Sequence, residues 1–373
     1  MSKLFDSFQM RGLSLPNRIV IAPMCQYSAV NGNATDWHMA LFNTLALSGA
    51  GLYCIEATAV SPEGRITPGC LGLWSDENEE ALARVLRVVR AVSTIPMAIQ
   101  LGHAGRKGSS QPPWQGGQLI LPDQHGGWWP EGPSAEPHKP DEPAPRELTL
   151  ADLDTLTNRF VQAAERAVRL GFDAIEVHAA HGYLLHQFLS PIANKRVDQY
   201  GGTLENRMRF PLQVFNAVRR AVPDHIPVGI RVSATDWVDD EPSWTLEQTI
   251  AFGHAIKQAG GDWIDVSSAG VSPRQRIAVG QGYQVPFAQA IKEQVGLPTM
   301  AVGLITEPAQ AQAIIAQGQA DMVALARGML YNPRWVWHAA AELGEQVDAP
   351  VQFWRALPAG KNAVFRNATF GAR

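Results

Sequence analysis

Short apolar runs alternate with longer amphipathic stretches along most of the chain. The short runs, such as RIVIAP at residues 18–23, are continuously apolar rather than alternating between apolar and polar positions. Continuous runs of this kind are typical of parallel strands that are covered on both faces. The pattern predicts eight of them, at residues 18–23, 52–57, 96–101, 173–178, 227–232, 263–267, 299–302 and 322–326.

The stretches between these runs carry apolar residues at helical spacing. In residues 149–170 the pattern consists of Leu153, Leu156, Phe160, Ala163 and Ala164, which would form one buried helix face. Eight strands that alternate with helices, without a break in composition, predict an α/β fold of a single domain over residues 1–373, a (βα)₈ TIM barrel. A doubly wound sheet is the alternative, which the regular spacing disfavours. Helices are expected at residues 36–48, 76–92, 149–170, 205–222, 245–259, 286–295, 308–317 and 332–343.

Residues 104–150 interrupt the alternation after the third strand. This stretch holds 9 of the 26 prolines and three tryptophans, Trp114, Trp128 and Trp129. A loop this long in a compact domain needs a functional reason. We interpret it as an insertion that covers part of the barrel mouth; the alternative is a surface excursion that only packs against the barrel.

Composition narrows the class of protein. The 31 basic and 35 acidic residues give a net charge of −4, without the basic excess typical of nucleic-acid binders. No apolar run approaches the ~18 residues that span a bilayer, and the N-terminus lacks the apolar core of a signal peptide. Three cysteines, Cys25, Cys54 and Cys70, form no CxxC pair. We expect a cytoplasmic protein that binds neither nucleic acid nor membrane.

The chemistry of a barrel lies where its strands end. Strand four ends in His178, His181 and Tyr183. Two histidines three residues apart could ligate a metal, but the ends of strands five to eight offer no further ligand except Asp236, farther out. No pair of acids suits glycoside hydrolysis either. We therefore expect no metal, and a role for the histidines other than core packing.

Other strand ends carry the groups that a phosphorylated heterocycle needs. Gly303 and Arg327 follow strands seven and eight, where barrels often bind phosphate. Gln100 offers a donor and an acceptor to an amide edge, and Arg231, with no obvious acid beside it, needs an anion. Together these residues predict bound FMN, and the absence of GxGxxG after a strand excludes a Rossmann site.

At this point the sequence resembles the Old Yellow Enzyme family of FMN-dependent ene-reductases. The resemblance covers nearly the whole chain. Its most specific motifs are NRIVIAPM, EVHAAHGY, FLSP together with Asn194, DQYGG and ENRMRF. Cys25 and Tyr27 in PMCQYS, Ile66 in EGRI and Arg355 in QFWR are similar to the thermophilic-like bacterial branch.

The resemblance implies that one set of residues holds the flavin. Arg231 would stabilise negative charge near flavin N1, and Cys25 would lie near N5, where it would tune the potential without acting as a nucleophile. Cys54 and Cys70 are expected to be ordinary packing residues. The implied FMN contacts are Ala22, Pro23, Met24, Cys25, Ala57, Gln100, Arg231, Gly303, Ala326 and Arg327.

The resemblance also implies a reaction. NADPH or NADH would reduce the flavin, and flavin N5 would then give hydride to the β-carbon of an activated alkene (an enone, nitroalkene or maleimide) in a ping-pong cycle. His178 and His181 would bind the activating oxygen, and Tyr183 would protonate the α-carbon. Tyr27, Ile66 and the tryptophan-rich insertion would shape the substrate pocket.

Relatives in this branch associate so that a C-terminal arginine reaches the neighbouring active site. Arg355 matches it, in a tail of residues 344–373 that we expect at a subunit interface of a homodimer or homotetramer. The chain departs from the family in extending eighteen residues beyond Arg355, and in Ala326, where relatives often have glycine.

Two other functions compete with this one. A flavin barrel of different chemistry usually adds an iron–sulfur cysteine cluster and a nucleotide domain, which three scattered cysteines and 373 residues exclude. A flavoprotein without turnover, sensing redox state through Cys25, stays open.

Overall fold

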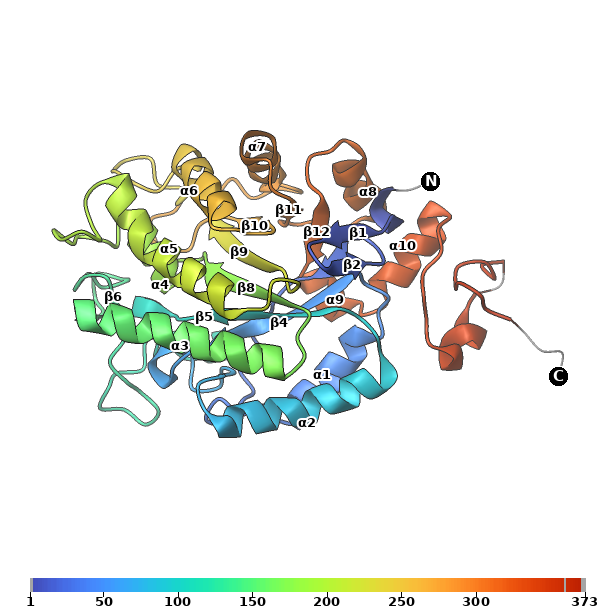
Figure 1. The fold of residues 1–373 in the computed structure, drawn as a ribbon, viewed down its shortest axis with the longest axis horizontal. Helices are drawn as coiled ribbons and strands as arrows, with labels where there is room; N and C mark the ends of the chain where they lie inside the picture. The colour runs from blue at the N-terminus through green and yellow to red at the C-terminus, as the bar shows by residue number, and fades with distance from the viewer. Residues whose placement is uncertain (1–2, 359, 370–373) are drawn as a thin grey trace.

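In the computed structural model, which describes residues 3–358 and 360–369, eight parallel strands close into one barrel. The order around the barrel is β10-β11-β12-β3-β4-β5-β8-β9, so each strand pairs with the next strand of the predicted series (Figure 1). This confirms the (βα)₈ fold and all eight predicted strands. Their bounds are β3 Ile19–Ile21, β4 Leu52–Ala59, β5 Met97–Gly102, β8 Ala174–Ala179, β9 Val228–Ser233, β10 Ile264–Ser267, β11 Thr299–Ala301 and β12 Met322–Leu325.

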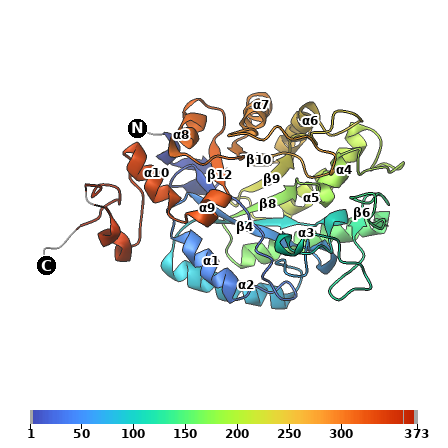
Figure 2. The ribbon, with the colours of Figure 1, turned by 180° about the vertical axis from the view of Figure 1, so that it is seen from behind.

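Helices surround the barrel and bury the other face of each strand (Figure 2). The predicted apolar face of α3 (Leu150–Arg169) is fully buried, and Thr149 and Asp152 form a capping box at its start. Two short helices, α4 and α9, were not predicted because each is a single turn or two. The helices are α1 Asp36–Ala46, α2 Asp76–Val92, α3 Leu150–Arg169, α4 Leu184–Leu189, α5 Leu204–Ala221, α6 Leu246–Gln258, α7 Val285–Val295, α8 Pro308–Ala316, α9 Arg327–Tyr331 and α10 Trp335–Leu343.

A hairpin that the sequence pattern did not predict closes the N-terminal end of the barrel. Strands β1 (Phe8–Met10) and β2 (Leu13–Leu15) pair with each other. Met10 and Leu15 pack on the first residues of the barrel strands, such as Leu52 and Met322. Because this end is plugged, the open end for a ligand is the C-terminal one.

The insertion at residues 104–150 is partly ordered into short elements. It contains the 3₁₀ turns η3 (Gly105–Lys107) and η4 (Pro113–Gln115) and a pair of two-residue strands, β6 (Glu131–Gly132) and β7 (Arg146–Glu147). Its side chains contact loops at the C-terminal end of the barrel. Arg106 Nη2 donates to the Val271 carbonyl after β10 at 2.7 Å, and Trp128 Nε1 donates to the Glu63 carbonyl after β4 at 3.0 Å.

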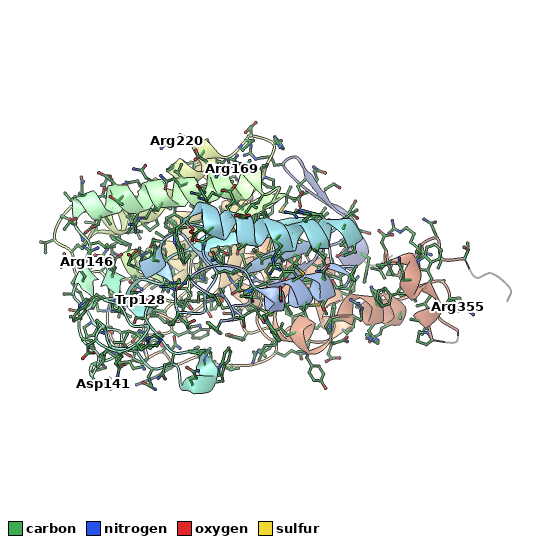
Figure 3. The ribbon with its side chains drawn as sticks, turned by 90° about the horizontal axis from the view of Figure 1, so that it is seen from below. Trp128, Asp141, Arg146, Arg169, Arg220 and Arg355 are labelled. Atoms are coloured by element: carbon green, nitrogen blue, oxygen red, sulfur yellow. The ribbon has the colours of Figure 1, made fainter. Side chains whose placement is uncertain are left out.

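The C-terminal tail leaves the barrel on the opposite side. Arg355 lies in the 3₁₀ turn η5 (Val351–Ala356) and is exposed. Figure 3 places it at the far end of the molecule from the insertion residues Trp128, Asp141 and Arg146. Residues 359 and 370–373 of the predicted tail lie outside the described residues.

Candidate active site

The end of β8 brings three predicted catalytic side chains together. The ring centroids of His178 and His181 are 5.2 Å apart, and that of Tyr183 lies 5.0 Å from His178, with the ring planes nearly perpendicular. The loop that follows β8 achieves this with two successive left-handed residues, His181 at φ 58° and Gly182 at φ 70°. A Cβ on Gly182 would lie 2.1 Å from the Gly270 carbonyl oxygen, so this position requires glycine.

Hydrogen bonds with His186 and Lys107 hold this loop in place. Gly182 N–H donates to His186 Nδ1 at 2.8 Å, and His186 Nε2 lies 2.9 Å from Asp236 Oδ1. Lys107 Nζ, from the insertion, donates to the His181 and Gly270 carbonyls at 2.9 and 3.0 Å. The strained turn therefore persists because groups from three different elements hold it.

Both histidines at the end of β8 are neutral hydrogen-bonding groups. Burial, followed by the charge of Arg231, lowers the pKa of His178 and of His181 well below the usual value. His178 Nδ1 accepts from Ala180 N–H at 3.2 Å, which leaves Nε2 as the protonated nitrogen. His181 Nε2 lies 2.8 Å from the Ser267 hydroxyl, which is also placed to donate to Gln284 Oε1 at 3.3 Å. When Ser267 donates to His181, the His181 proton is on Nδ1; when Ser267 donates to Gln284, it is on Nε2. Each neutral ring therefore carries one N–H donor.

Tyr183 keeps its phenolic proton. Burial is the main reason that its pKa lies well above the usual value of 10. Lys107 Nζ lies 5.1 Å from the centroid of the Tyr183 ring. Tyr183 is therefore a proton donor at neutral pH, in contact with the histidine pair.

A cavity of about 190 Å³ opens at the ends of β11 and β12. Its lining includes Ala22, Arg231, Gly303, Ala326 and Arg327, five of the predicted cofactor residues. Gly303 has φ 110°, a backbone conformation that favours glycine, and a Cβ there would lie 2.9 Å from Gln284 Nε2. Ala326 has a negative φ of −102°, so this position does not need the left-handed backbone that favours glycine. Two arginines and a glycine cradle fit a phosphorylated ligand.

The remaining predicted cofactor residues follow the adjacent strands. Pro23, Met24 and Cys25 come directly after β3, and Ala57 pairs with Gln100 across β4 and β5, just past a bulge at Ile55 and Ala57. Ala57 lines a small cavity together with His178, Tyr183 and Ile66. Burial raises the pKa of the Cys25 thiol well above its usual value, so it is a neutral S–H. Cys54 and Cys70 are buried.

The expectation that Arg231 has no acid beside it is wrong. Parallel pairing of β9 and β10 sets Asp265 directly opposite Arg231, and Arg231 Nε lies 3.2 Å from Asp265 Oδ2. Glu176 on β8 is a second buried acid, which accepts from Gln100 Nε2 at 2.8 Å and from Trp263 Nε1 at 3.2 Å. A charged residue inside an otherwise apolar strand was the available signal, because the barrel interior is where such a side chain points.

Glu176 predicts a pH dependence of stability. Burial, then the charge of Asp265, raises its pKa to about 7. The pKa of this carboxyl is higher in the folded protein than in the unfolded chain. The resulting stabilisation is therefore complete below the unfolded-state pKa and is lost as pH rises through about 7. We expect the free energy of unfolding to fall by on the order of 2 kcal/mol between pH 5 and 8. Glu176→Gln should make this free energy less dependent on pH. An equally steep fall in Glu176→Gln, with exposed Glu77→Gln as control, would contradict this assignment.

The other predicted residues divide into two groups. Tyr27 and Ile66 line one cavity of about 200 Å³ next to the histidine site, and Tyr27 packs edge-on against Trp114 at 5.7 Å. Arg355 lies at the other end of the molecule from the insertion residues Trp128 and Arg146 (Figure 3). Among residues 3–358 and 360–369, no cluster of three or more His, Cys, Asp or Glu side chains could hold a metal, and no helix is long and apolar enough to cross a membrane.

The barrel is closed at its N-terminal end and carries, at its C-terminal end, a cavity lined by two arginines and a glycine beside a pair of neutral histidines, which suits a phosphorylated redox cofactor. Comparison with known proteins agrees: the NADH:flavin oxidoreductase / NADH oxidase family matches residues 3–346. The chain belongs to this family. It is therefore an FMN-dependent oxidoreductase, and the resemblance to Old Yellow Enzymes is confirmed.

Relatives cover nearly the whole chain. An NADPH dehydrogenase of Geobacillus thermodenitrificans is 42% identical over 354 residues, which is 94% of this chain and 98% of the relative. NADH:flavin oxidoreductase FG08077 of Gibberella zeae is 42% identical over 378 residues, covering 97% of this chain and 91% of the relative. The structure of morphinone reductase in complex with tetrahydroNAD superposes with a TM-score of 0.73 at 27% identity, covering 99% and 95%.

Proposed function

We propose that the chain is an NAD(P)H-dependent ene-reductase that reduces activated alkenes in a ping-pong cycle. The observation that carries the proposal is the cluster of two neutral histidines and a protonated tyrosine at the end of β8. The relatives named NADPH dehydrogenase support NADPH as the electron donor.

The FMN contacts follow from the residues that line the site. Arg327, Gly303 and Ala326 would hold the phosphate, and Gln100 and Arg231 would face the amide edge of the ring, with Ala22, Pro23, Met24, Cys25 and Ala57 around it. When bound, FMN supplies the exchange of two electrons between the nicotinamide and the alkene. Because Asp265 already pairs with Arg231, the positive charge offered to the ring is smaller than that of a lone arginine.

The histidine pair would bind the carbonyl or nitro oxygen of the alkene. Two N–H donors aimed at one oxygen stabilise the negative charge that develops on it during reduction. Tyr183, in contact with His178, would then deliver its proton to the α-carbon. Neutral histidines suit this role, since they donate hydrogen bonds at neutral pH without needing to be protonated.

Tyr27, Ile66 and the insertion would form the wall of the substrate pocket. The insertion contacts the loops after β4, β8 and β10 through Trp128, Lys107 and Arg106, which supports its role as a cover of the barrel mouth. The cytoplasmic location stays a prediction.

The proposal is tested first by reduction of a panel of alkenes. Purified holoenzyme should be yellow, and it should consume NADPH faster when an enone, a nitroalkene or a maleimide is added. Failure to reduce all three alkene classes, with FMN bound, would reject ene-reductase function and favour a redox-sensing flavoprotein.

Arg355 would complete the site of a neighbouring subunit in a homodimer or homotetramer. It is exposed and distant from the mouth of its own barrel (Figure 3). We expect Arg355→Ala to raise KM for the alkene by about tenfold, the loss of roughly 1.4 kcal/mol of binding, or to change the oligomeric state seen by light scattering. Gln352→Ala, exposed on the same turn, is the matched control. No change in either measurement would remove Arg355 from the site.

A further inference from the structure

The cavity that Tyr27 and Ile66 line, next to the histidine site, is basic on its insertion side. It has a volume of about 200 Å³ and lies between Tyr27 and Ile66 on one side and insertion residues on the other. Ile66 also lines the small cavity that contains His178 and Tyr183, so the two spaces share a wall. We call it the basic cavity because Arg106, Lys107 and Lys139 line it; burial lowers the pKa of His138, also in the lining, to about 3, so that ring is neutral.

Its positive charges exceed its negative ones. Glu142 is the one carboxylate among the described residues of the lining, and it pairs with Lys139 at 3.2 Å. Arg106 donates to the carbonyls of Glu136, Pro137 and Val271, and Lys107 donates to those of His181 and Gly270. These partners are neutral. Within the part of the chain that the structure describes, no carboxylate forms an ion pair with either cation.

Arg106 is buried and has an unused hydrogen-bond donor, and Lys107 is half-buried. Arg106 is 5% exposed and its Nε has no hydrogen-bond partner, and His138 Nδ1 is likewise buried and unpartnered. Burial lowers the pKa of Arg106 to about 10 and that of Lys107 to about 8. Removing a cation from water without a counter-charge is costly. A bound anion would offset that cost.

We propose that the basic cavity binds the anionic end, a carboxylate or a phosphate, of a molecule whose reacting end lies at His178 and Tyr183. Lys107 lies between the reacting end and the anionic end of such a molecule. Its Nζ is 5.1 Å from the centroid of the Tyr183 ring, and the residue also lines the basic cavity. The inference rests on the proposed function, since it assigns a second contact to the same ligand. The anion has two possible sources, a carboxylated alkene or a phosphate of the nicotinamide dinucleotide.

Two opposite charge changes test the proposal. Lys139→Gln removes a positive charge from the lining and Glu142→Gln removes the negative one; both side chains are partly exposed, at 33% and 15%, so the fold should tolerate the changes. The matched controls are Lys257→Gln and Glu293→Gln, near the C-terminal ends of the outer helices α6 and α7. Binding to oxidised holoenzyme is followed through the flavin absorbance.

The probes are pairs that differ in charge. The first pair is 4-(2-nitrovinyl)benzoate and the corresponding benzamide, and the ratio of their Kd values reports the carboxylate alone. The second is NADP⁺ and NAD⁺. For one charge at roughly 8 Å in a partly solvated site we expect about a fivefold change: weaker anion binding in Lys139→Gln, stronger in Glu142→Gln, and neither in the controls.

The outcomes separate the two sources. A shifted benzoate-to-benzamide ratio assigns the basic cavity to a substrate carboxylate. A shift confined to the dinucleotides assigns it to a coenzyme phosphate. Equal Kd values in all variants for every probe would overturn the subsite, while reduction of the neutral benzamide by the wild-type protein would leave the proposed function intact. Because binding is measured without turnover, loss of alkene reduction would count against the function alone.

Discussion

Replacing both His178 and His181 by alanine is expected to abolish alkene reduction while FMN stays bound. The two rings provide the N–H donors at the end of β8, and each donor to a developing oxyanion contributes about 10²–10³ in rate. Since such donors act as a unit, we expect the combined loss to be at least about 10³-fold. Reoxidation of reduced enzyme by an enone, followed by anaerobic stopped flow, measures this step directly.

The matched control for the pair is His254→Ala, an exposed histidine on α6. The visible spectrum of the double variant should keep the flavin bands, because the phosphate cradle lies at the ends of β11 and β12, away from the β8 loop. Enone-driven reoxidation at the wild-type rate would refute the oxygen-binding role of the histidines.

Replacing Tyr183 by phenylalanine is expected to slow the alkene step by about 10²-fold or more, the usual contribution of a positioned general acid. The phenol is buried and protonated, and its ring contacts His178. Reduction of the flavin by NADPH requires no proton from Tyr183, so that half-reaction should change much less. Stopped flow on each half-reaction separates the two effects.

Tyr331→Phe, with its side chain 94% exposed on α9, controls for the loss of a hydroxyl as such. Equal slowing of both half-reactions in Tyr183→Phe would mean that the hydroxyl positions the ligand or the loop and does not donate the proton.

The barrel was predictable from the sequence because its strands are apolar on both faces. Residues 19–22 and 322–326, for example, are apolar at every position and do not suit a half-exposed sheet, and the regular spacing of the eight runs leaves few arrangements other than a closed barrel. The hairpin at Phe8–Leu15 was missed since its strands have only three residues each, and periodicity is not readable over so short a length.

The site was predictable only one strand end at a time. His178, His181 and Tyr183 stand within six residues, so their meeting follows from one turn. Asp265 and Ser267 lie on β10, which is two strands from β8 around the barrel. The contact of Asp265 with Arg231 depends on strand register, and the contact of Ser267 with His181 depends on the strained loop after β8. The local sequence pattern predicts neither contact.

The insertion was recognised from its proline and tryptophan content, but its charges were not. Arg106 and Lys107 lie five and six residues after the end of the predicted third strand, where nothing in the local pattern distinguishes them from surface residues. Only the fold shows that Arg106 is buried, that Lys107 is half-buried, and that both donate to backbone carbonyls at the mouth.

The most direct test of the central claim is an anaerobic double-mixing experiment on the purified holoenzyme. NADPH should bleach the flavin absorbance, and a subsequent pulse of cyclohexenone should restore it, with one cyclohexanone formed per flavin reoxidised. A flavin that is bleached by NADPH and stays reduced in the presence of enones, nitroalkenes and maleimides would contradict ene-reductase function.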